Sequence, residues 1–216
     1  MVLKAGGITV RRSLTVYHNP QSSAAEQYRS IRNNIQFFSE NHKVRSMVVT
    51  SPGTGEGKTT TACNLALSIA ARGERVLLID ADFKTPTMHL TFNVPNTGGL
   101  TSVLIGKLSL AEAMYPSDIP GLDILPSGPV GMRSAELITS QGISFLLQRA
   151  KEKYDTVIID GPPVLISSDA AVLANLCGGV IFVVQRGKTQ KEAASEAKRT
   201  LERVKANILG VVVNKK

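Results

Sequence analysis

The sequence contains no tryptophan, only two cysteines and no apolar run approaching the roughly 18–20 residues that span a bilayer. Two cysteines without metal-type spacing exclude a disulfide framework and a zinc site. Residues 1–20 alternate basic and apolar residues without a long apolar core, which excludes a signal peptide. These absences predict a soluble, reduced, cytoplasmic protein.

The composition is that of a folded domain with an excess of positive charge. The chain has 216 residues, of which 43% are apolar, and its 25 lysines and arginines against 17 acidic residues give a net charge of +8. We expect a basic arm over residues 1–20 and one domain over residues 21–216. The charge fits either a solvated surface or attraction to an anionic partner, such as a nucleotide, a nucleic acid or an acidic membrane leaflet. Charge alone does not choose between these interpretations.

Apolar, β-rich runs alternate with helical stretches along the chain. The expected strands cover residues 44–50, 75–79, 122–125, 156–159, 180–184 and 208–213. The expected helices cover residues 22–38, 59–72, 100–115, 134–152, 168–176 and 189–206. This alternation predicts an α/β fold with a doubly wound, mostly parallel sheet flanked by helices. Ligands of such sheets bind outside the carboxyl ends of the strands, which here are the segments after Thr50, Ile79 and Ile159.

The segment after the first expected strand, residues 51–60, reads SPGTGEGKTT. Its end matches the phosphate-binding loop G-x-x-x-x-G-K-[ST], but Pro52 stands where that pattern has its first glycine. Small residues let backbone N–H groups approach phosphate oxygens, Lys58 can reach the β- and γ-phosphates, and the Thr59 hydroxyl can bind Mg²⁺. The alternative is an ordinary glycine-rich turn between a strand and a helix. The candidate nucleotide-binding residues of this loop are Gly53, Thr54, Gly55, Glu56, Gly57, Lys58, Thr59 and Thr60.

Two later strands end in aspartates. Asp80 and Asp82 follow the run LLI, and Asp160 follows the run VII. A carboxylate at this edge of the sheet can bind Mg²⁺ directly or through water, which is the role we expect for Asp160. If the strand geometry continues, the i, i+2 spacing puts Asp80 and Asp82 on one side, where one of them can accept a proton in phosphoryl transfer. An aspartate after a strand is otherwise a turn-forming or helix-capping residue.

Together, the segments GTGEGKTT, LLIDADFKTP and VIIDGPP resemble the motifs of the bacterial protein-tyrosine kinases of capsule and exopolysaccharide synthesis, which have the P-loop NTPase fold. The resemblance covers about residues 20–214. It implies an ATP- and Mg²⁺-dependent enzyme that phosphorylates itself or other proteins on tyrosine. On this resemblance, the catalytic residues are Lys58, Asp80 and Asp82, and the metal-binding residues are Thr59, Asp82 and Asp160. Lys84 stands where the family often has arginine.

The same superclass includes the Min/Par cell-positioning ATPases, which gives the alternative of an ATP-driven switch or scaffold without kinase activity. The resemblance to the kinases is the better one, because the Par-type ATPases have a signature lysine at the position of Gly53. Asn214 ends the last expected strand, where relatives read the adenine with an asparagine that can both donate and accept. An asparagine that only caps the strand end is the alternative.

A helical motif resembles the self-association motif of the kinases. Glu26, Arg29 and Arg32 have the E-x-x-R-x-x-R spacing with which those kinases build a ring from neighbouring subunits. Surface ion pairs along one helix are the other explanation of this spacing. The resemblance also implies a separate transmembrane protein that activates the kinase and recruits it to the inner face of the cell membrane.

The tyrosines fit the kinase family less well. Its members usually carry a tail with clustered tyrosines, whereas Tyr17, Tyr28, Tyr115 and Tyr154 are scattered. Either a tyrosine-bearing tail has been removed or has diverged, or the protein phosphorylates other tyrosine-bearing proteins. The same pattern motivates the switch alternative. Specific nucleic-acid binding is not expected, because the sequence has neither clustered aromatic residues nor a base-reading motif.

Overall fold

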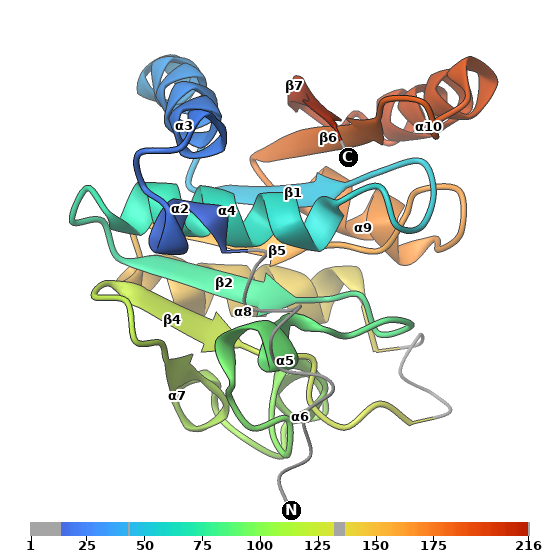
Figure 1. Ribbon diagram of the computed structural model, residues 1–216. Helices are drawn as coiled ribbons and strands as arrows, with labels where there is room; N and C mark the ends of the chain where they lie inside the picture. Colours follow the sequence, from blue (N-terminus) through green and yellow to red (C-terminus); the bar gives the residue numbers. More distant parts are fainter. Residues whose placement is uncertain (1–13, 43, 132–136, 216) are drawn as a thin grey trace, which may run out of the picture.

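The computed structural model describes residues 14–42, 44–131 and 137–215, without the side chains of residues 38–42 and 140. In this part of the chain a seven-stranded sheet, in the order β3-β4-β2-β5-β1-β6-β7, forms the centre of the domain (Figure 1). All neighbouring strands are parallel except β3 and β4. The strands are β1 (Ser46–Thr50), β2 (Val76–Asp80), β3 (Tyr115–Pro116), β4 (Leu122–Leu125), β5 (Thr156–Asp160), β6 (Gly179–Gln185) and β7 (Ile208–Asn214). The expected α/β fold with a doubly wound, mostly parallel sheet is confirmed.

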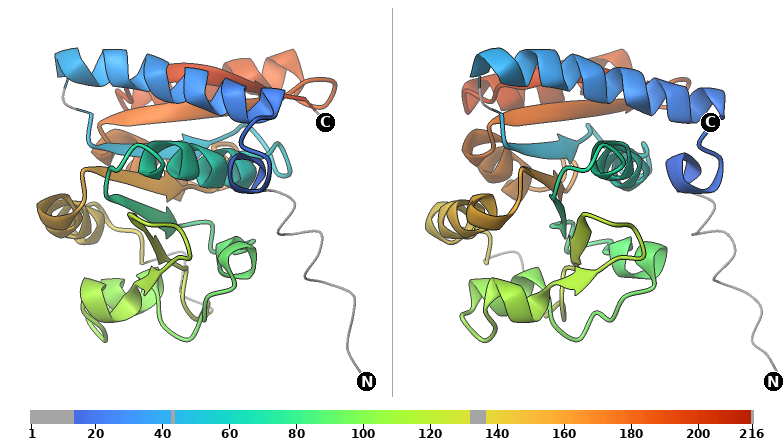
Figure 2. Two further views of the ribbon diagram at one scale, coloured as in Figure 1. Left: turned by 60° about the vertical axis from the view of Figure 1, so that its left-hand side comes forward. Right: turned by 90° about the vertical axis from the view of Figure 1, so that its left-hand side faces the viewer.

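Helices cover both faces of this sheet (Figure 2). They are α2 (Thr15–His18), α3 (Ser23–His42), α4 (Lys58–Ala70), α5 (Met88–Phe92), α6 (Leu100–Leu104), α7 (Leu110–Ala113), α8 (Ser140–Lys153), α9 (Asp169–Leu176) and α10 (Lys191–Arg203). Successive side chains of a strand point to opposite faces, so Met47 and Val49 pack with α3 and α4, while Val48 packs with α8, α9 and α10. Every residue of β1 is buried, as a parallel strand covered on both faces requires.

The single helix expected over residues 100–115 is wrong. The structure has the two short helices α6 and α7 there, followed by the antiparallel strand β3. Gly106 follows the first helix with φ of +71°, and Ser109 begins the second helix through a capping box with Glu112. A residue in the left-handed conformation does not continue a helix, so the chain turns here although its apolar pattern continues.

Other helix ends also differ from the expectation. α8 begins at Ser140, because the hydroxyl oxygen of Thr139 accepts a hydrogen bond from the Gly142 N–H at 3.1 Å and caps the helix. Residues 134–136 of the expected helix lie outside the described residues. α3 is longer than expected and α10 is shorter. In the described part of the chain, no helix has the combination of length and hydropathy needed to cross a membrane.

The described end of the expected arm packs against the domain. Leu14 is buried in the same cluster as residues of α3 and α4, and the Val16 N–H donates to Oδ1 of Asn64 at 3.0 Å. Contacts with the domain therefore begin before residue 21. Residues 1–13 of the arm lie outside the described residues.

Candidate functional site

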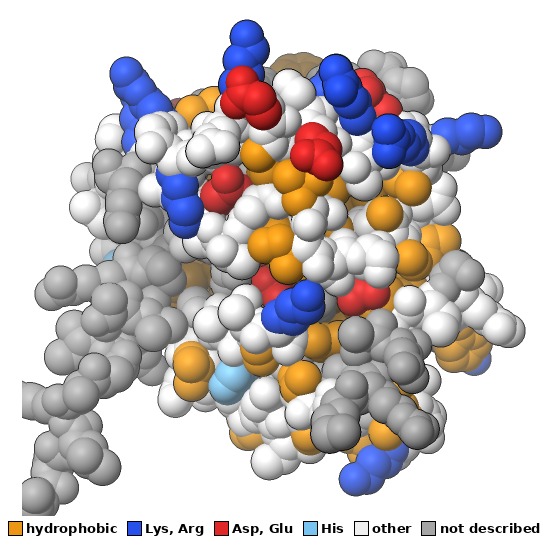
Figure 3. Space-filling model, turned by 90° about the vertical axis from the view of Figure 1, so that its right-hand side faces the viewer, with side chains coloured by type: hydrophobic (Ala, Val, Ile, Leu, Met, Phe, Trp, Pro, Cys, Tyr) orange, Lys and Arg blue, Asp and Glu red, His pale blue; other side chains and the backbone are white. Residues whose placement is uncertain are grey.

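The order of the sheet brings the three sequence motifs together at one edge. β2, β5 and β1 are neighbours, and Asp80 at the end of β2 pairs in register with Asp160 at the end of β5. The phosphate loop, residues 51–57, follows β1. Figure 3 shows this edge from outside, with Lys and Arg side chains gathered along the upper part of the face. Segments far apart in the sequence thus meet where the parallel strands end.

The phosphate loop offers unused N–H groups to a ligand. Within the described residues, the backbone N–H groups of residues 55–58 donate no hydrogen bond to another protein group. Gly55 and Gly57 have φ of +67° and +95°, and Gly57 is the N-cap of α4. Free N–H groups at the start of a helix carry partial positive charge and form a site for anions. The arrangement fits the phosphates of a nucleotide.

Lys58 and Thr59, the first residues of α4, each contact one of the acidic strand ends. Lys58 is buried, and its Nζ lies 3.7 Å from Oδ2 of Asp82. The Thr59 hydroxyl donates to Oδ2 of Asp160 at 2.6 Å. Thr60 follows on the same turn and accepts a hydrogen bond at its carbonyl oxygen from within α4. The structure therefore brings Lys58, Thr59, Asp82 and Asp160 together in one cluster, in which Thr59 is partly buried and the other three are buried.

Asp160 has one carboxylate oxygen to spare. Its Oδ1 is buried and has no hydrogen-bond partner among the residues that the structure describes. Burial raises the pKa of Asp160 to about 7, although the Thr59 hydroxyl and the Lys58 ammonium group oppose the rise. In the described chain, no three His, Cys, Asp or Glu side chains form a metal site by themselves. The spare oxygen beside a threonine hydroxyl fits Mg²⁺, which takes one or two carboxylates and fills its shell with phosphate oxygens and water.

Asp80 and Asp82 occupy different positions after β2. Oδ1 of Asp80 accepts a hydrogen bond from the Asp82 N–H and Oδ2 accepts one from the Met88 N–H, both at 3.2 Å. Asp82 accepts hydrogen bonds from the N–H and the hydroxyl of Thr85 instead. Burial and the charge of Asp160 hold the pKa of Asp80 well above its usual range. β2 ends at Asp80 and does not continue to Asp82. The i, i+2 spacing of a strand therefore does not apply to these two residues, and it does not place their carboxylates on one side.

Two expected nucleotide-binding residues are held by other groups of the protein. The Gly53 N–H donates to Oε2 of Glu56 at 2.8 Å and so points to that carboxylate. Nδ2 of Asn214 donates to the carbonyl oxygen of Glu56 at 3.2 Å, which puts the end of β7 against the loop. Lys188 and Thr189, which no sequence motif marks, also contact the loop. Their turn reaches the loop only through the fold, so no local pattern could have identified them.

Replacing Gly57 with alanine will disrupt the phosphate loop. A Cβ at this position would lie 2.0 Å from Nδ2 of Asn214, in addition to the unfavourable φ. We expect Gly57→Ala to lower the free energy of unfolding by about 1–3 kcal/mol and to weaken nucleotide binding, measured by thermal melting and ADP titration. Gly53→Ala is the matched control, because its Cβ would come no closer than 4.0 Å to Glu56. Equal behaviour of the two variants would contradict this geometry.

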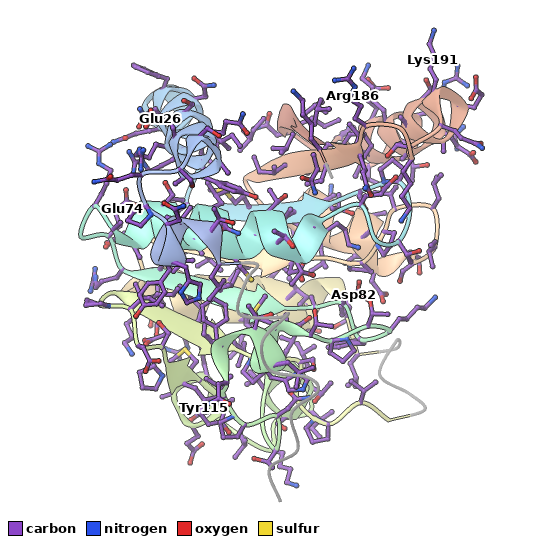
Figure 4. The ribbon with its side chains drawn as sticks, in the orientation of Figure 1. Glu26, Glu74, Asp82, Tyr115, Arg186 and Lys191 are labelled. Atoms are coloured by element: carbon purple, nitrogen blue, oxygen red, sulfur yellow. The ribbon has the colours of Figure 1, made fainter. Side chains whose placement is uncertain are left out.

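The residues of the E-x-x-R-x-x-R motif lie on α3, away from the acidic strand ends. Figure 4 shows Glu26 on α3 at the upper left and Asp82 at the right. Glu26 is exposed and forms an ion pair with Arg29. Arg32 donates to the carbonyl oxygen of Ser68 at 2.7 Å and ties α3 to α4. In one copy of the chain, the motif and the buried acidic cluster are therefore separate.

The tyrosines differ in accessibility. The Tyr154 side chain is buried, and its hydroxyl donates to Oδ2 of Asp123 at 2.5 Å, which makes it a structural residue. Burial raises the pKa of Tyr28, and a hydrogen bond with Thr61 of α4 opposes the rise. Tyr17 is 51% exposed and is the most accessible of the four.

Comparison with known proteins agrees with this site. A family model described as an AAA domain matches residues 44–211. The chain is 44% identical to tyrosine-protein kinase YwqD of Bacillus subtilis (strain 168) over 213 residues, which cover 99% of this chain and 90% of that protein. The match extends well beyond the three motifs and includes α3.

Solved structures show the same fold. The kinase domain of the Escherichia coli tyrosine kinase ETK is 32% identical and superposes with a TM-score of 0.90, covering 94% of this chain and 79% of that one. The septum site-determining protein MinD from Pyrococcus horikoshii OT3, complexed with Mg-ADP, is 25% identical with a TM-score of 0.68, covering 79% and 70%. Both comparisons confirm the P-loop NTPase fold.

Proposed function

The chain belongs to the bacterial tyrosine-protein kinases, and from this membership we propose how its own residues bind ATP and Mg²⁺ and transfer the γ-phosphoryl group to tyrosine. One juxtaposition supports the proposal most directly. Lys58 and Thr59 follow a loop with free N–H groups and lie within contact distance of Asp82 and Asp160, respectively.

The phosphate loop and α4 hold the nucleotide. The free N–H groups of the loop and Nζ of Lys58 bind the β- and γ-phosphates and balance the charge that spreads over the transferred group. Mg²⁺ supplies further charge neutralisation when bound, and Thr59, Asp160 and Asp82 would hold it. Asn214, at the end of β7 beside the loop, reads the adenine.

The carboxylates after β2 take part in the transfer itself. One of Asp80 and Asp82 accepts the phenolic proton of the acceptor tyrosine as the tyrosine oxygen bonds to the γ-phosphorus and ADP leaves. Both side chains are buried, Asp82 beside Lys58 and Asp80 beside Asp160.

Incubation of the protein with γ-labelled ATP, Mg²⁺ and a tyrosine-bearing peptide tests this function. We expect label on tyrosine, and no label when Mg²⁺ is removed with a chelator. Hydrolysis of ATP with nucleotide-dependent assembly, but without phosphotyrosine, would support an ATP-driven switch or scaffold instead.

The family resemblance also supports a place of action. We propose that the kinase regulates the synthesis or export of a capsular polysaccharide or exopolysaccharide at the inner face of the cell membrane, where a transmembrane protein activates it. Co-purification with such a protein, and higher tyrosine phosphorylation in the presence of its cytoplasmic segment, are the expected results. Equal phosphorylation with and without that segment would contradict the activation.

Self-association through α3 fits the geometry of the motif. Glu26 and Arg29 pair at the surface of the helix, where a second copy can reach them. Arg32 is partly engaged by α4 of its own chain. We propose that Glu26 and Arg29 make most of the contact with a neighbouring copy in a ring, and that Arg32 holds the helix in place.

Glu26→Ala will therefore lower the oligomeric mass without changing the melting temperature. Arg29→Ala will lower the mass with at most a small change in melting temperature, because the hydrogen bond that Arg29 donates to the Pro20 carbonyl is exposed. Arg32→Ala will also lower the melting temperature, because α3 loses its hydrogen bond to Ser68. Sedimentation velocity and thermal melting separate the two effects. Gln27→Ala, at an exposed neighbouring position on the same helix, is the control. An unchanged mass in both surface variants would rule out the proposed contact.

A further inference from the structure

The turn between β6 and α10, residues 186–189, packs against the phosphate loop. Nζ of Lys188 donates hydrogen bonds to the carbonyl oxygens of Thr54 at 2.7 Å and Gly55 at 3.1 Å. A Cβ on Gly55 would lie 2.7 Å from the same Nζ, so the contact is close. Arg186 and Lys191, which flank Lys188 and Thr189, lie at the upper right of Figure 4, on the same side of the molecule as Asp82. The turn is therefore at the nucleotide edge of the sheet.

The Lys188 contact fixes the direction of two peptide groups. A trans peptide is planar, with its N–H opposite its C=O. Because the Thr54 carbonyl points to Lys188, the N–H of Gly55, which belongs to the same peptide group, points away from Lys188. The Gly55 carbonyl also points to Lys188, so the N–H of Glu56 likewise points away. These two N–H groups are among those that donate to no protein group in the described chain. The ammonium group also polarises both amides, which strengthens their N–H groups as donors to phosphate.

Thr189 holds the loop through the buried side chain of Glu56. The Thr189 hydroxyl donates to Oε1 of Glu56 at 2.5 Å, and Oε2 of Glu56 accepts the Gly53 N–H at 2.8 Å. The Thr189 oxygen in turn accepts the Gln185 N–H at 2.8 Å. A chain of hydrogen bonds thus runs from the end of β6 through Glu56 to the first glycine of the loop. A buried carboxylate costs stability unless its oxygens are satisfied, and these donors satisfy both.

We propose that Lys188 and Thr189 are positioning residues of the nucleotide site. They hold the phosphate loop in the conformation that presents the N–H groups of Gly55 and Glu56 to the phosphates of ADP or ATP. This inference rests on the proposed nucleotide binding and adds to it two residues from a distant segment. Neither side chain touches the transferred group, so both act through the loop.

Titration of the full chain with Mg-ADP tests the role of Lys188. We expect Lys188→Met to weaken binding by about threefold to tenfold, and Lys188→Arg to keep most of the affinity, because arginine also donates to carbonyl oxygens. Lys191→Met is the matched control, since it removes an exposed lysine on α10 that makes no described contact with the loop. We expect its affinity to equal that of the wild type.

Thr189 gives an independent arm of the experiment. Thr189→Val removes the hydroxyl at constant shape and will weaken Mg-ADP binding, whereas Thr189→Ser will retain it. In the Lys188→Met/Thr189→Val double variant, the fold-increase in the Kd for Mg-ADP will be smaller than the product of the two single fold-increases, because both residues act on one loop. In the kinase assay, the KM for ATP will rise in the single variants while kcat at saturating ATP changes less than KM does.

The outcomes separate this inference from the proposed function. A wild type that does not bind Mg-ADP would overturn the proposed function and this inference together. A wild type that binds, with Lys188→Met and Thr189→Val as tight as Lys191→Met, would overturn the positioning role alone. A loss of affinity matched by a lower melting temperature and not restored by Lys188→Arg or Thr189→Ser would show a merely structural role and would also overturn it.

Discussion

Lys58→Met will reduce transfer of phosphate to tyrosine by about a thousandfold or more. Lys58 is buried at the start of α4, with Nζ 3.7 Å from Oδ2 of Asp82, in the cluster that also holds Thr59 and Asp160. Removing its charge leaves the Asp82 and Asp160 carboxylates without the ammonium group that opposes their charge. Initial rates with labelled ATP and a tyrosine-bearing peptide measure the loss.

Two further variants test whether that loss follows from removing any lysine or from removing positive charge alone. Lys107→Met removes an exposed lysine after α6 and should keep the wild-type rate. Lys58→Arg keeps the charge but places a larger planar group in a buried position, and we expect it to stay far below the wild-type rate. A Lys58→Met variant that remains folded and transfers phosphate at more than a tenth of the wild-type rate would refute the assignment.

Asp160→Asn will separate activity from stability. Asparagine keeps an oxygen that can accept the Thr59 hydroxyl but loses the negative charge that Mg²⁺ binding requires. We expect transfer to fall by about a hundredfold or more. In the absence of nucleotide and Mg²⁺, the same change will raise the free energy of unfolding by about 1–2 kcal/mol, or about 2–8 °C in melting temperature. The reason is that the variant no longer buries a charge with an unpartnered oxygen.

The stability gain will depend on pH in a defined direction. The folded-state pKa of Asp160, about 7, lies above the value of about 4 in an unfolded chain. Between these values the folded wild type binds more protons than the unfolded chain, so this group makes the wild type less stable as the pH rises. The difference in melting temperature between Asp160→Asn and the wild type will therefore grow from about pH 4 to about pH 7. A difference that shrinks over this range would contradict the burial of the Asp160 charge.

The fold and the centre of the site follow from local patterns in the sequence. Continuous apolar runs such as residues 75–79 identify buried parallel strands, and parallel strands end at one edge. Asp80, Asp160 and the phosphate loop were therefore expected to meet there, and the structure brings them together. The helix over residues 100–115 was wrong because the left-handed turn at Gly106 leaves no mark in the apolar pattern.

Contacts made across the fold were not predictable in the same way. Thr189 lies far from Glu56 in the sequence, and neither residue type indicates the hydrogen bond between them. The turn at Asp82 depends on Thr85 and on the Asp80 carboxylate, so the spacing of the two aspartates alone could not place their side chains. Arg32 belongs to the E-x-x-R-x-x-R motif, and the motif alone gave no indication that this side chain also donates to the carbonyl of Ser68 on α4.

The position of β1 between β5 and β6 has a kinetic consequence. Val49 pairs with Asp160 of β5, and Val48 pairs with Val180 of β6. The phosphate loop thus follows a strand whose two neighbours come much later in the sequence. Such contacts of high sequence separation form late and slowly during folding, because a long loop must close first. The phosphate site is therefore complete only once nearly the whole chain has folded. Nucleotide binding should slow amide hydrogen exchange in β5 and β6 as well as in the loop, since each of these strands opens only when the central sheet comes apart.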